Sequence, residues 1–217
     1  MPTRKTVALE VLLHVVLALP VALLLIDFAL NRLTANPIEA ATLRTGKTAL
    51  VLLILSLACT PTYRVVRLPA LLQLRRILGL YAFAYAAVHA MIFVGVDYRF
   101  DPEFLWEATV EKCYALAGLA SFLLLVLPAI TSFGNWSRRL GPMGRLVHRA
   151  VYIATLSAVT HYFWAAKVDR SEPLWFGAIV LLLLLLRLAA MQRAIECLRL
   201  YLERLFRRPL QPGHKEG

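Results

Sequence analysis

The chain has 217 residues, a length typical of one or two soluble domains, but its composition excludes that class of protein. Hydrophobic residues make up 60% of the sequence, and they are concentrated in runs of about twenty residues, long enough to cross a membrane. The net charge of +11 does not indicate a nucleic-acid-binding domain, because the basic residues lie in short segments between apolar runs.

Six apolar stretches predict transmembrane helices, at residues 7–30, 48–66, 77–96, 114–133, 148–167 and 174–190. The first is too long for the apolar region of a signal peptide, so we interpret it as a retained span. No internal repeat is evident. The sequence therefore predicts an all-α integral membrane protein, with a six-helix transmembrane domain over residues 1–190.

The remaining segment, residues 191–217, has a different character. From 191 to about 207, apolar residues follow one side of a predicted helix and arginines occupy the others. This pattern is typical of a basic amphipathic helix that lies on a membrane surface. The end of the chain, from Pro209 onward, is expected to be a disordered tail.

The loop charges predict the orientation of the protein. With six spans, 17 of the 24 Lys and Arg fall on one side of the membrane, together with both chain ends. The opposite side holds the other basic residues and a group of acidic ones, namely Asp97, Asp101, Glu103, Glu107, Glu111, Asp169 and Glu172. The positive-inside rule places the basic side, and both termini, in the cytoplasm.

Two histidines are predicted to lie at the same depth in the membrane. His89 precedes Asp97 by eight residues, and His161 precedes Asp169 by eight residues. At a helical rise of about 1.5 Å per residue, each imidazole lies roughly 12 Å below the outer surface. Both belong to spans that run outward, so the two imidazoles can hold one flat ligand between them.

The neighbouring residues favour a porphyrin as that ligand. Small residues precede the histidines at helical spacing, namely Ala82 and Ala86 in one span and Ala154 and Ala158 in the other. Two axial imidazoles give a low-spin heme iron suited to electron transfer. The alternative is that each histidine is a polar residue bonded to a neighbouring helix. Zinc is disfavoured because no third ligand is evident at that depth.

His148 raises the question of a second heme. It lies 13 residues before His161, about 20 Å along the helix toward the cytoplasm. The position 13 residues before His89 is Arg76, which cannot ligate iron. A second heme with two histidine ligands therefore lacks a partner for His148, unless His14 in the first span supplies one.

Other roles are open for this inner group. His148, Arg75 and Arg76 could bind heme propionates, a quinone or a flavin phosphate, or lie among lipid headgroups.

Three segments resemble the MsrQ family, formerly called YedZ. They are TGKTALVLLILSLACTP (residues 45–61), RRILGLYAFAYAAVHAMIF (75–93) and RLVHRAVYIATLSAVTHYFWAAK (145–167), and the resemblance extends from about residue 7 to 205. This family comprises heme-binding membrane subunits of bacterial periplasmic methionine sulfoxide reductase systems. It belongs to the broader ferric-reductase and NADPH-oxidase transmembrane group.

The broader group holds two stacked hemes with two histidines on each of two helices. Three of these four positions match, at His89, His148 and His161, whereas the fourth is Arg76 or Arg75. The resemblance thus implies one heme b at the outer site and leaves a second, inner heme in question. FMN is also associated with the family, although the chain contains no phosphate-cradling motif.

The resemblance implies an electron-transfer subunit of the bacterial inner membrane, with no catalytic site of its own for the final substrate. Its electrons would come from the quinone pool or a cytoplasmic flavin reductase and pass to the periplasmic molybdopterin subunit MsrP, which reduces methionine sulfoxide in oxidised proteins. The alternative is a stand-alone reductase of ferric iron or another small substrate. A transporter is disfavoured, because few residues, such as Pro20 and Pro128, interrupt the predicted spans.

Overall fold

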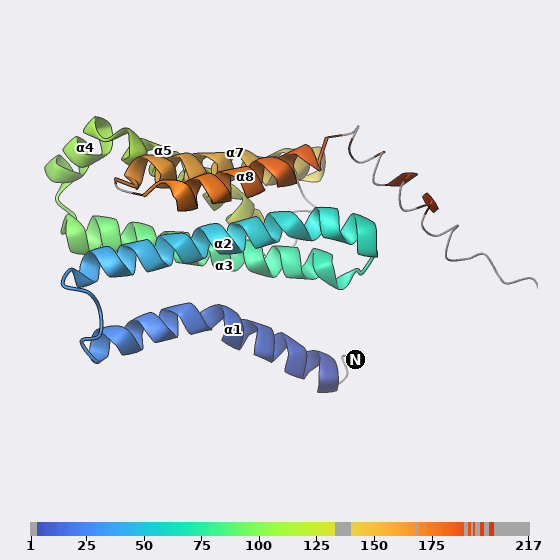
Figure 1. Ribbon diagram of the computed structural model, residues 1–217, viewed down its shortest axis with the longest axis horizontal. Helices are drawn as coiled ribbons and strands as arrows, with labels where there is room; N and C mark the ends of the chain where they lie inside the picture. Colours follow the sequence, from blue (N-terminus) through green and yellow to red (C-terminus); the bar gives the residue numbers. More distant parts are fainter. Residues whose placement is uncertain are drawn as a thin grey trace, which may run out of the picture.

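The computed structural model describes residues 4–132, 140–167 and 169–188, together with residues 191, 193, 196, 197, 200 and 201. Within these residues all regular structure is helical, which confirms the predicted class. The helices are α1 (Arg4–Ala29), α2 (Pro37–Val66), α3 (Ala70–Met91), the π-helix η1 (Ile92–Asp97), α4 (Pro102–Glu111), α5 (Cys113–Thr131), α7 (Gly141–Ala165) and α8 (Ser171–Leu185). Figure 1 shows the long helices side by side, with α4 at one end of the bundle.

In the described part of the chain, four helical segments are long and apolar enough to cross a membrane by length and composition: Ala8–Ala29, Pro37–Val66, Ala70–Asp97 and Cys113–Thr131. The chain is therefore a membrane protein with several apolar helices. The two other predicted spans correspond to α7, which contains several basic residues, and to α8, which is apolar but has only 15 residues.

Helix α2 begins at Pro37, well before the predicted start at residue 48. Asn36 caps it, since the Asn36 side chain accepts a hydrogen bond from the Glu39 backbone N–H at 3.2 Å and donates one to the Glu39 carboxylate at 3.2 Å. Proline at the first helical position favours this start. The additional turns carry residues that contact the candidate site.

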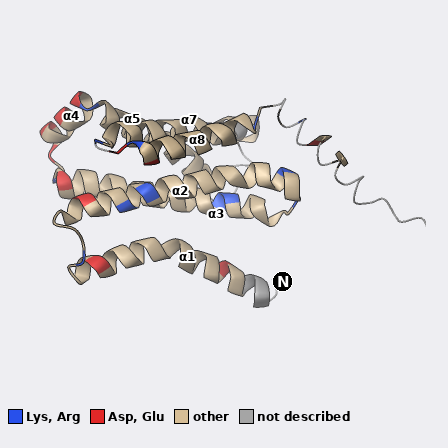
Figure 2. Ribbon diagram, viewed as in Figure 1, with Lys and Arg blue, Asp and Glu red and all other residues tan. Residues whose placement is uncertain are grey.

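The acidic segment between the third and fourth predicted spans contains the helix α4. Asp101 caps it by accepting hydrogen bonds from the backbone N–H groups of Glu103 (3.0 Å) and Phe104 (3.3 Å), and Pro102 occupies the first helical position. Figure 2 shows acidic side chains at this end of the bundle, which is the predicted outer end.

Helix α1 bends near its middle (Figure 1), and it contains Pro20, a residue that kinks helices. The hydroxyl of Tyr85 in α3 lies next to this bend. It donates to the Leu17 carbonyl (2.9 Å) and accepts from the Val21 N–H (3.1 Å), two groups that an unbroken helix would join to each other. The Tyr85 side chain thus bridges two backbone groups one helical turn apart and attaches α1 to α3.

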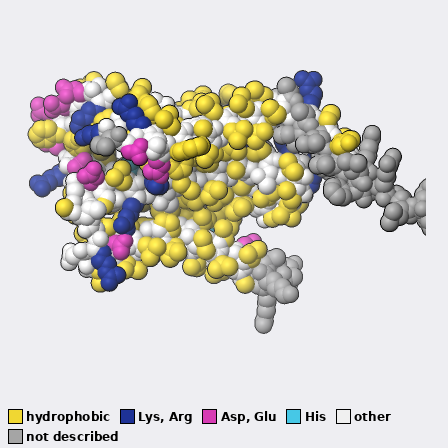
Figure 3. All heavy atoms as spheres, in the orientation of Figure 1, with side chains coloured by type: hydrophobic (Ala, Val, Ile, Leu, Met, Phe, Trp, Pro, Cys, Tyr) yellow, Lys and Arg dark blue, Asp and Glu magenta, His cyan; other side chains and the backbone are white. Residues whose placement is uncertain are grey.

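The core is built from two helical hairpins. Helix α2 packs along α3, and α5 packs along α7, while α8 lies against α7 and α2. One buried cluster joins both hairpins and includes Leu53, Ala82, Leu125 and Ala154. Apolar side chains also cover the middle of the visible surface of the bundle, while charged side chains gather mainly at its left end (Figure 3), as expected where helices face lipid.

The last predicted span ends earlier than expected, at Leu185 rather than at residue 190. The chain turns there, and Arg187 points inward, where it donates to the Leu57 carbonyl at 2.6 Å and to the Tyr152 hydroxyl. Of the predicted amphipathic segment, most residues lie outside the described part. Glu196 within it forms an ion pair with Arg67 at 2.9 Å.

Candidate functional site

The structure brings His89 and His161 together between the two hairpins. His89 lies near the end of α3 and His161 near the end of α7. Their ring centroids are 6.0 Å apart, and the ring planes are nearly perpendicular, at 81°. Helices α3 and α7 make little direct backbone contact, so the imidazoles reach toward each other across the space between them.

Both imidazoles are oriented by backbone carbonyls of the neighbouring helix. Nδ1 of His89 lies 2.9 Å from the Thr42 carbonyl oxygen of α2, and Nδ1 of His161 lies 2.7 Å from the Tyr114 carbonyl oxygen of α5. A carbonyl oxygen can only accept, so Nδ1 must carry the proton in each ring. Nε2 of each neutral imidazole is then the nitrogen with a free lone pair.

This arrangement fits a metal held between two imidazoles. With metal–nitrogen bonds of about 2 Å, and each nitrogen about 1 Å from its ring centre, two axial imidazoles on one metal have centroids about 6 Å apart. The observed 6.0 Å agrees. The Nδ1–H to carbonyl bonds are the outer-shell contacts that metal-ligating histidines typically make.

Among the described residues, no group of three or more His, Cys, Asp and Glu could hold a metal ion. A site with two protein ligands suits an iron whose other four ligands come from a porphyrin. Both histidines are half-buried, and the small residues Ala82 and Ala154, about two helical turns before them, are buried in the core that the two hairpins share.

The predicted inner residues do not form a second pair of histidines. Arg76 of α3 donates to the Ser132 carbonyl at the end of α5, and Arg75 donates to the Thr60 hydroxyl of α2 at 3.1 Å. His148 of α7 is half-buried and lies within electrostatic range of Arg75.

His14 has another partner in the structure. Its Nδ1 lies 3.0 Å from the Tyr81 hydroxyl, and the two rings are 5.7 Å apart. This contact joins α1 to α3 and accounts for His14 as a residue of the helix interface.

Arg187 adds a positive charge to the inner group of His148, Arg75 and Arg76. The sequence alone did not indicate that Arg187 belongs to this site. It lies over the Tyr152 ring, 4.7 Å from the centroid, and is within electrostatic range of Arg75. Its place in the sequence, at the end of an apolar run, indicated only the end of a span. The inner group is therefore strongly cationic, which suits an anionic group.

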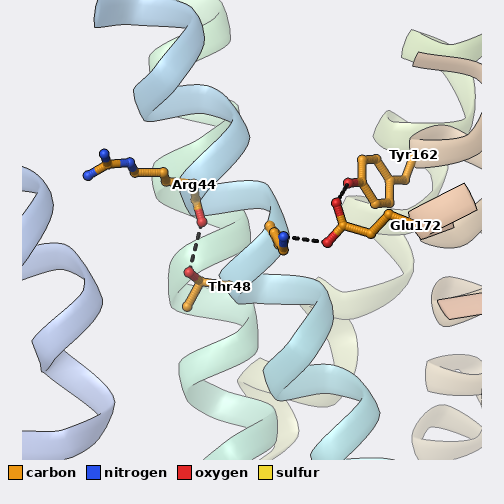
Figure 4. A network of polar contacts seen from close by, with 5 residues as sticks. Arg44, Thr48, Tyr162 and Glu172 are labelled. Atoms are coloured by element: carbon orange, nitrogen blue, oxygen red, sulfur yellow. Dashed lines mark hydrogen bonds and ion pairs between the residues drawn. The ribbon is translucent and has the colours of Figure 1, made fainter. Parts of the chain in front are cut away.

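A polar network connects α2, α7 and α8 at the outer end. Figure 4 shows the Tyr162 hydroxyl pointing at the Glu172 carboxylate, where it donates to Oε2 at 2.8 Å. The other carboxylate oxygen of Glu172 forms an ion pair with Lys47 of α2. The Lys47 ammonium, and next the Tyr162 hydroxyl, hold the pKa of Glu172 below its ordinary value of 4.5. Because Tyr162 follows His161, this network borders the candidate site.

Four residues of the site were not identified from the sequence, namely Thr42, Gly46, Tyr114 and Gly118. The first and third supply the carbonyls that orient the histidines. At each glycine, an added Cβ would lie within 3.0 Å of a histidine ring atom. The sequence does contain a signal for them. Adding 72 to the residue numbers 42, 46 and 89 gives 114, 118 and 161, so the three positions around each histidine recur with the same spacing.

Comparison with known proteins agrees with the heme site that the geometry indicates. The profile of a family described as ferric reductase like transmembrane component matches residues 45–159. Similar proteins include three with the name protein-methionine-sulfoxide reductase heme-binding subunit MsrQ. The one from Rhodospirillum rubrum is 42% identical over 72% of this chain and 76% of its own length. Those from Caulobacter vibrioides and Herminiimonas arsenicoxydans are each 37% identical, over 72% and 81% of this chain and 75% and 82% of their own lengths, respectively.

Proposed function

Because the chain belongs to the MsrQ family of ferric-reductase-like transmembrane proteins, we propose that it is a b-type cytochrome that carries electrons across the bacterial inner membrane to a periplasmic methionine sulfoxide reductase. The observation that carries this proposal is the pair His89 and His161. Their rings are 6.0 Å apart, and each donates Nδ1–H to a backbone carbonyl. The two Nε2 atoms would hold a heme, which would supply one-electron transfer.

The proposed topology has six spans, formed by α1, α2, α3 with η1, α5, α7 and α8, with both termini in the cytoplasm. The excess of Lys and Arg on the side of the chain ends supports this orientation. The side-by-side arrangement of these helices in Figure 1 agrees with it. We assign residues 1–190 to the transmembrane domain and residues 191–217 to a cytoplasmic basic segment.

The inner group His148, Arg75 and Arg76 is proposed to bind an anionic group near the cytoplasmic side. Heme propionates and the phosphate of FMN share the required chemistry, since arginine pairs with both carboxylate and phosphate. The hydrogen bonds of Arg75 to Thr60 and of Arg76 to Ser132 hold the two guanidinium groups of α3 against α2 and the end of α5. His148 adds a nitrogen that can ligate a metal or donate a hydrogen bond.

The reaction balance constrains the role of the chain. Reducing one methionine sulfoxide to methionine and water consumes two electrons and two protons. A quinol, or a reduced flavin on the cytoplasmic side, can release two of each. The protein must therefore pass two electrons in succession, and the proposed partner, the molybdopterin subunit MsrP, carries out the bond cleavage.

Reconstitution tests this function against its alternative, a stand-alone reductase of ferric iron or another small substrate. The purified protein is incorporated into liposomes with a quinol donor, and methionine sulfoxide reduction is measured with and without added MsrP. We expect reduction that requires MsrP and is lost in His89→Ala and His161→Ala. Rapid reduction of ferric complexes without MsrP, together with no electron transfer to MsrP, would favour the alternative.

A further inference from the structure

The two helical hairpins hold their histidines by the same arrangement of contacts, although no repeat was recognised in the sequence. In the hairpin α2–α3, a carbonyl at Thr42 accepts from His89, and in α5–α7 a carbonyl at Tyr114 accepts from His161. Both bonds join residues 47 positions apart, and in both hairpins a glycine follows the carbonyl by four residues. Four residues is about one helical turn, so each glycine lies on the same helix face as its carbonyl.

Each glycine is the point where the histidine ring presses against the neighbouring helix. A Cβ added at Gly46 would lie 2.9 Å from Nδ1 and 3.0 Å from Cε1 of His89. A Cβ added at Gly118 would lie 2.8 Å from Nδ1 and 3.0 Å from Cε1 of His161. These distances are too short for non-bonded atoms, so the ring would have to move away from its carbonyl.

Two other helical glycines, Gly79 and Gly177, do not share this property, and the close contact of a Cβ at Gly95 would be with Phe100 rather than with a histidine. A Cβ at Gly79 would meet its nearest neighbour, the Ser56 hydroxyl oxygen, at 3.4 Å, and one at Gly177 would meet Val159 at 3.4 Å. Both are ordinary contacts. The close approach to a histidine ring thus occurs at equivalent positions of the two hairpins and not at these other glycines.

We propose that Gly46 and Gly118 are positioning residues for the two histidines: each leaves the space in which an imidazole can donate Nδ1–H to the neighbouring helix and keep Nε2 free to ligate iron. This inference rests on the proposed function in so far as the ligand is heme. The hydrogen bond and the glycine act together, because the ring reaches its carbonyl only where the helix has no side chain.

The test compares Gly46→Ala and Gly118→Ala with the wild type and with the matched control Gly79→Ala, which lies in the same helix as His89. Heme retention is measured as the rate of heme transfer to apomyoglobin. Loss of such outer-shell contacts typically lowers metal affinity by about 10–100-fold, so we expect transfer to be faster by a similar factor in both variants. The control should match the wild type.

Two spectroscopic readouts separate a positioning role from a general packing role. The perpendicular ring planes predict a highly anisotropic low-spin EPR signal for the ferric wild type, and either substitution should change it. In the heme-free protein, ¹⁵N NMR of labelled histidine reports the tautomer. Gly46→Ala should remove the Nδ1–H form of His89 and leave that of His161, and Gly118→Ala should do the reverse.

The outcomes distinguish this inference from the proposed function. If the wild type binds heme and both alanine variants keep its transfer rate, EPR signal and tautomers, the positioning role is wrong while the cytochrome stands. If the folded wild type binds no heme but the tautomers change as expected, the positioning role holds and the cytochrome is wrong. Variants that lose heme with unchanged tautomers also contradict the positioning role.

Discussion

Glu172 joins three helices at the outer end of the bundle, and its removal should have a measurable effect on stability. The carboxylate accepts from the Tyr162 hydroxyl at 2.8 Å and forms an ion pair with Lys47 (Figure 4). The side chains of Lys47 and Glu172 are 51% and 43% exposed, so the ion pair belongs to the weak, solvent-screened class.

The magnitude follows from these two contacts. An exposed ion pair contributes about 0.5 kcal/mol, and the hydrogen bond to Tyr162 about 1 kcal/mol. Glu172→Ala removes both, and a loss of about 1.5 kcal/mol corresponds to a decrease in Tm of roughly 3–6 °C for a chain of this size. Glu172→Gln removes only the charge and should lower Tm by about 1–2 °C.

The effect of the charge should depend on pH. Because Lys47 and Tyr162 lower the pKa of Glu172 in the folded protein, the carboxylate stabilises the fold above its unfolded pKa. That contribution is lost as the pH falls through the lower, folded pKa. The wild type should therefore exceed Glu172→Gln in stability at pH 7, and the difference should vanish well below about pH 4.

Thermal unfolding in detergent, followed by intrinsic fluorescence, measures these differences, with Glu107→Gln on the exposed surface of α4 as the control. A double-mutant cycle of Lys47→Met and Glu172→Gln isolates the ion pair, with an expected coupling of about 0.2–1 kcal/mol. Zero coupling at pH 7, or a stability difference between the wild type and Glu172→Gln that is independent of pH, would refute the reasoning.

Two further predictions concern α3. Tyr85→Phe leaves the Leu17 carbonyl and the Val21 N–H without the bridging hydroxyl. We therefore expect the free energy of unfolding to fall by about 1–3 kcal/mol and backbone hydrogen exchange in α1 to become faster. Unchanged exchange would contradict the role of Tyr85. Arg76→His places an imidazole at the position that corresponds, 72 residues earlier, to His148, and should raise the heme count per chain from one to two. A count that stays at one would show that the inner half does not follow the repeat.

The sequence predicted most of the helical architecture because apolar runs are a strong and local signal. Helix boundaries were less predictable. The turns of α2 before residue 48 are stabilised by the cap Asn36 and by Pro37 at the first helical position, and the helix α4 is stabilised by the cap Asp101. Such caps involve only one or two residues, so the average composition of a segment does not reveal them. The end of α8 depends on tertiary contacts of Arg187 with Leu57 and Tyr152, which no local pattern contains.

The candidate site was predictable in part. Equal spacing from the outer charges indicated that His89 and His161 share a depth, and the structure brings the two rings together. Which backbone groups orient them was not predictable, because any residue supplies a carbonyl. The glycines Gly46 and Gly118 carry no chemistry of their own, so they were found only from the space that the structure leaves there.

The central claim is that His89 and His161 together hold one heme, and a heme count tests it most directly. Reduced-minus-oxidised spectra and pyridine hemochrome counts are measured on the purified wild type, His89→Ala, His161→Ala and His148→Ala, all expressed with adequate heme supply. The account predicts one b-type heme per chain that is lost in the first two variants and kept in the third. Heme that persists in both His89→Ala and His161→Ala, or a folded wild type without heme, would contradict it.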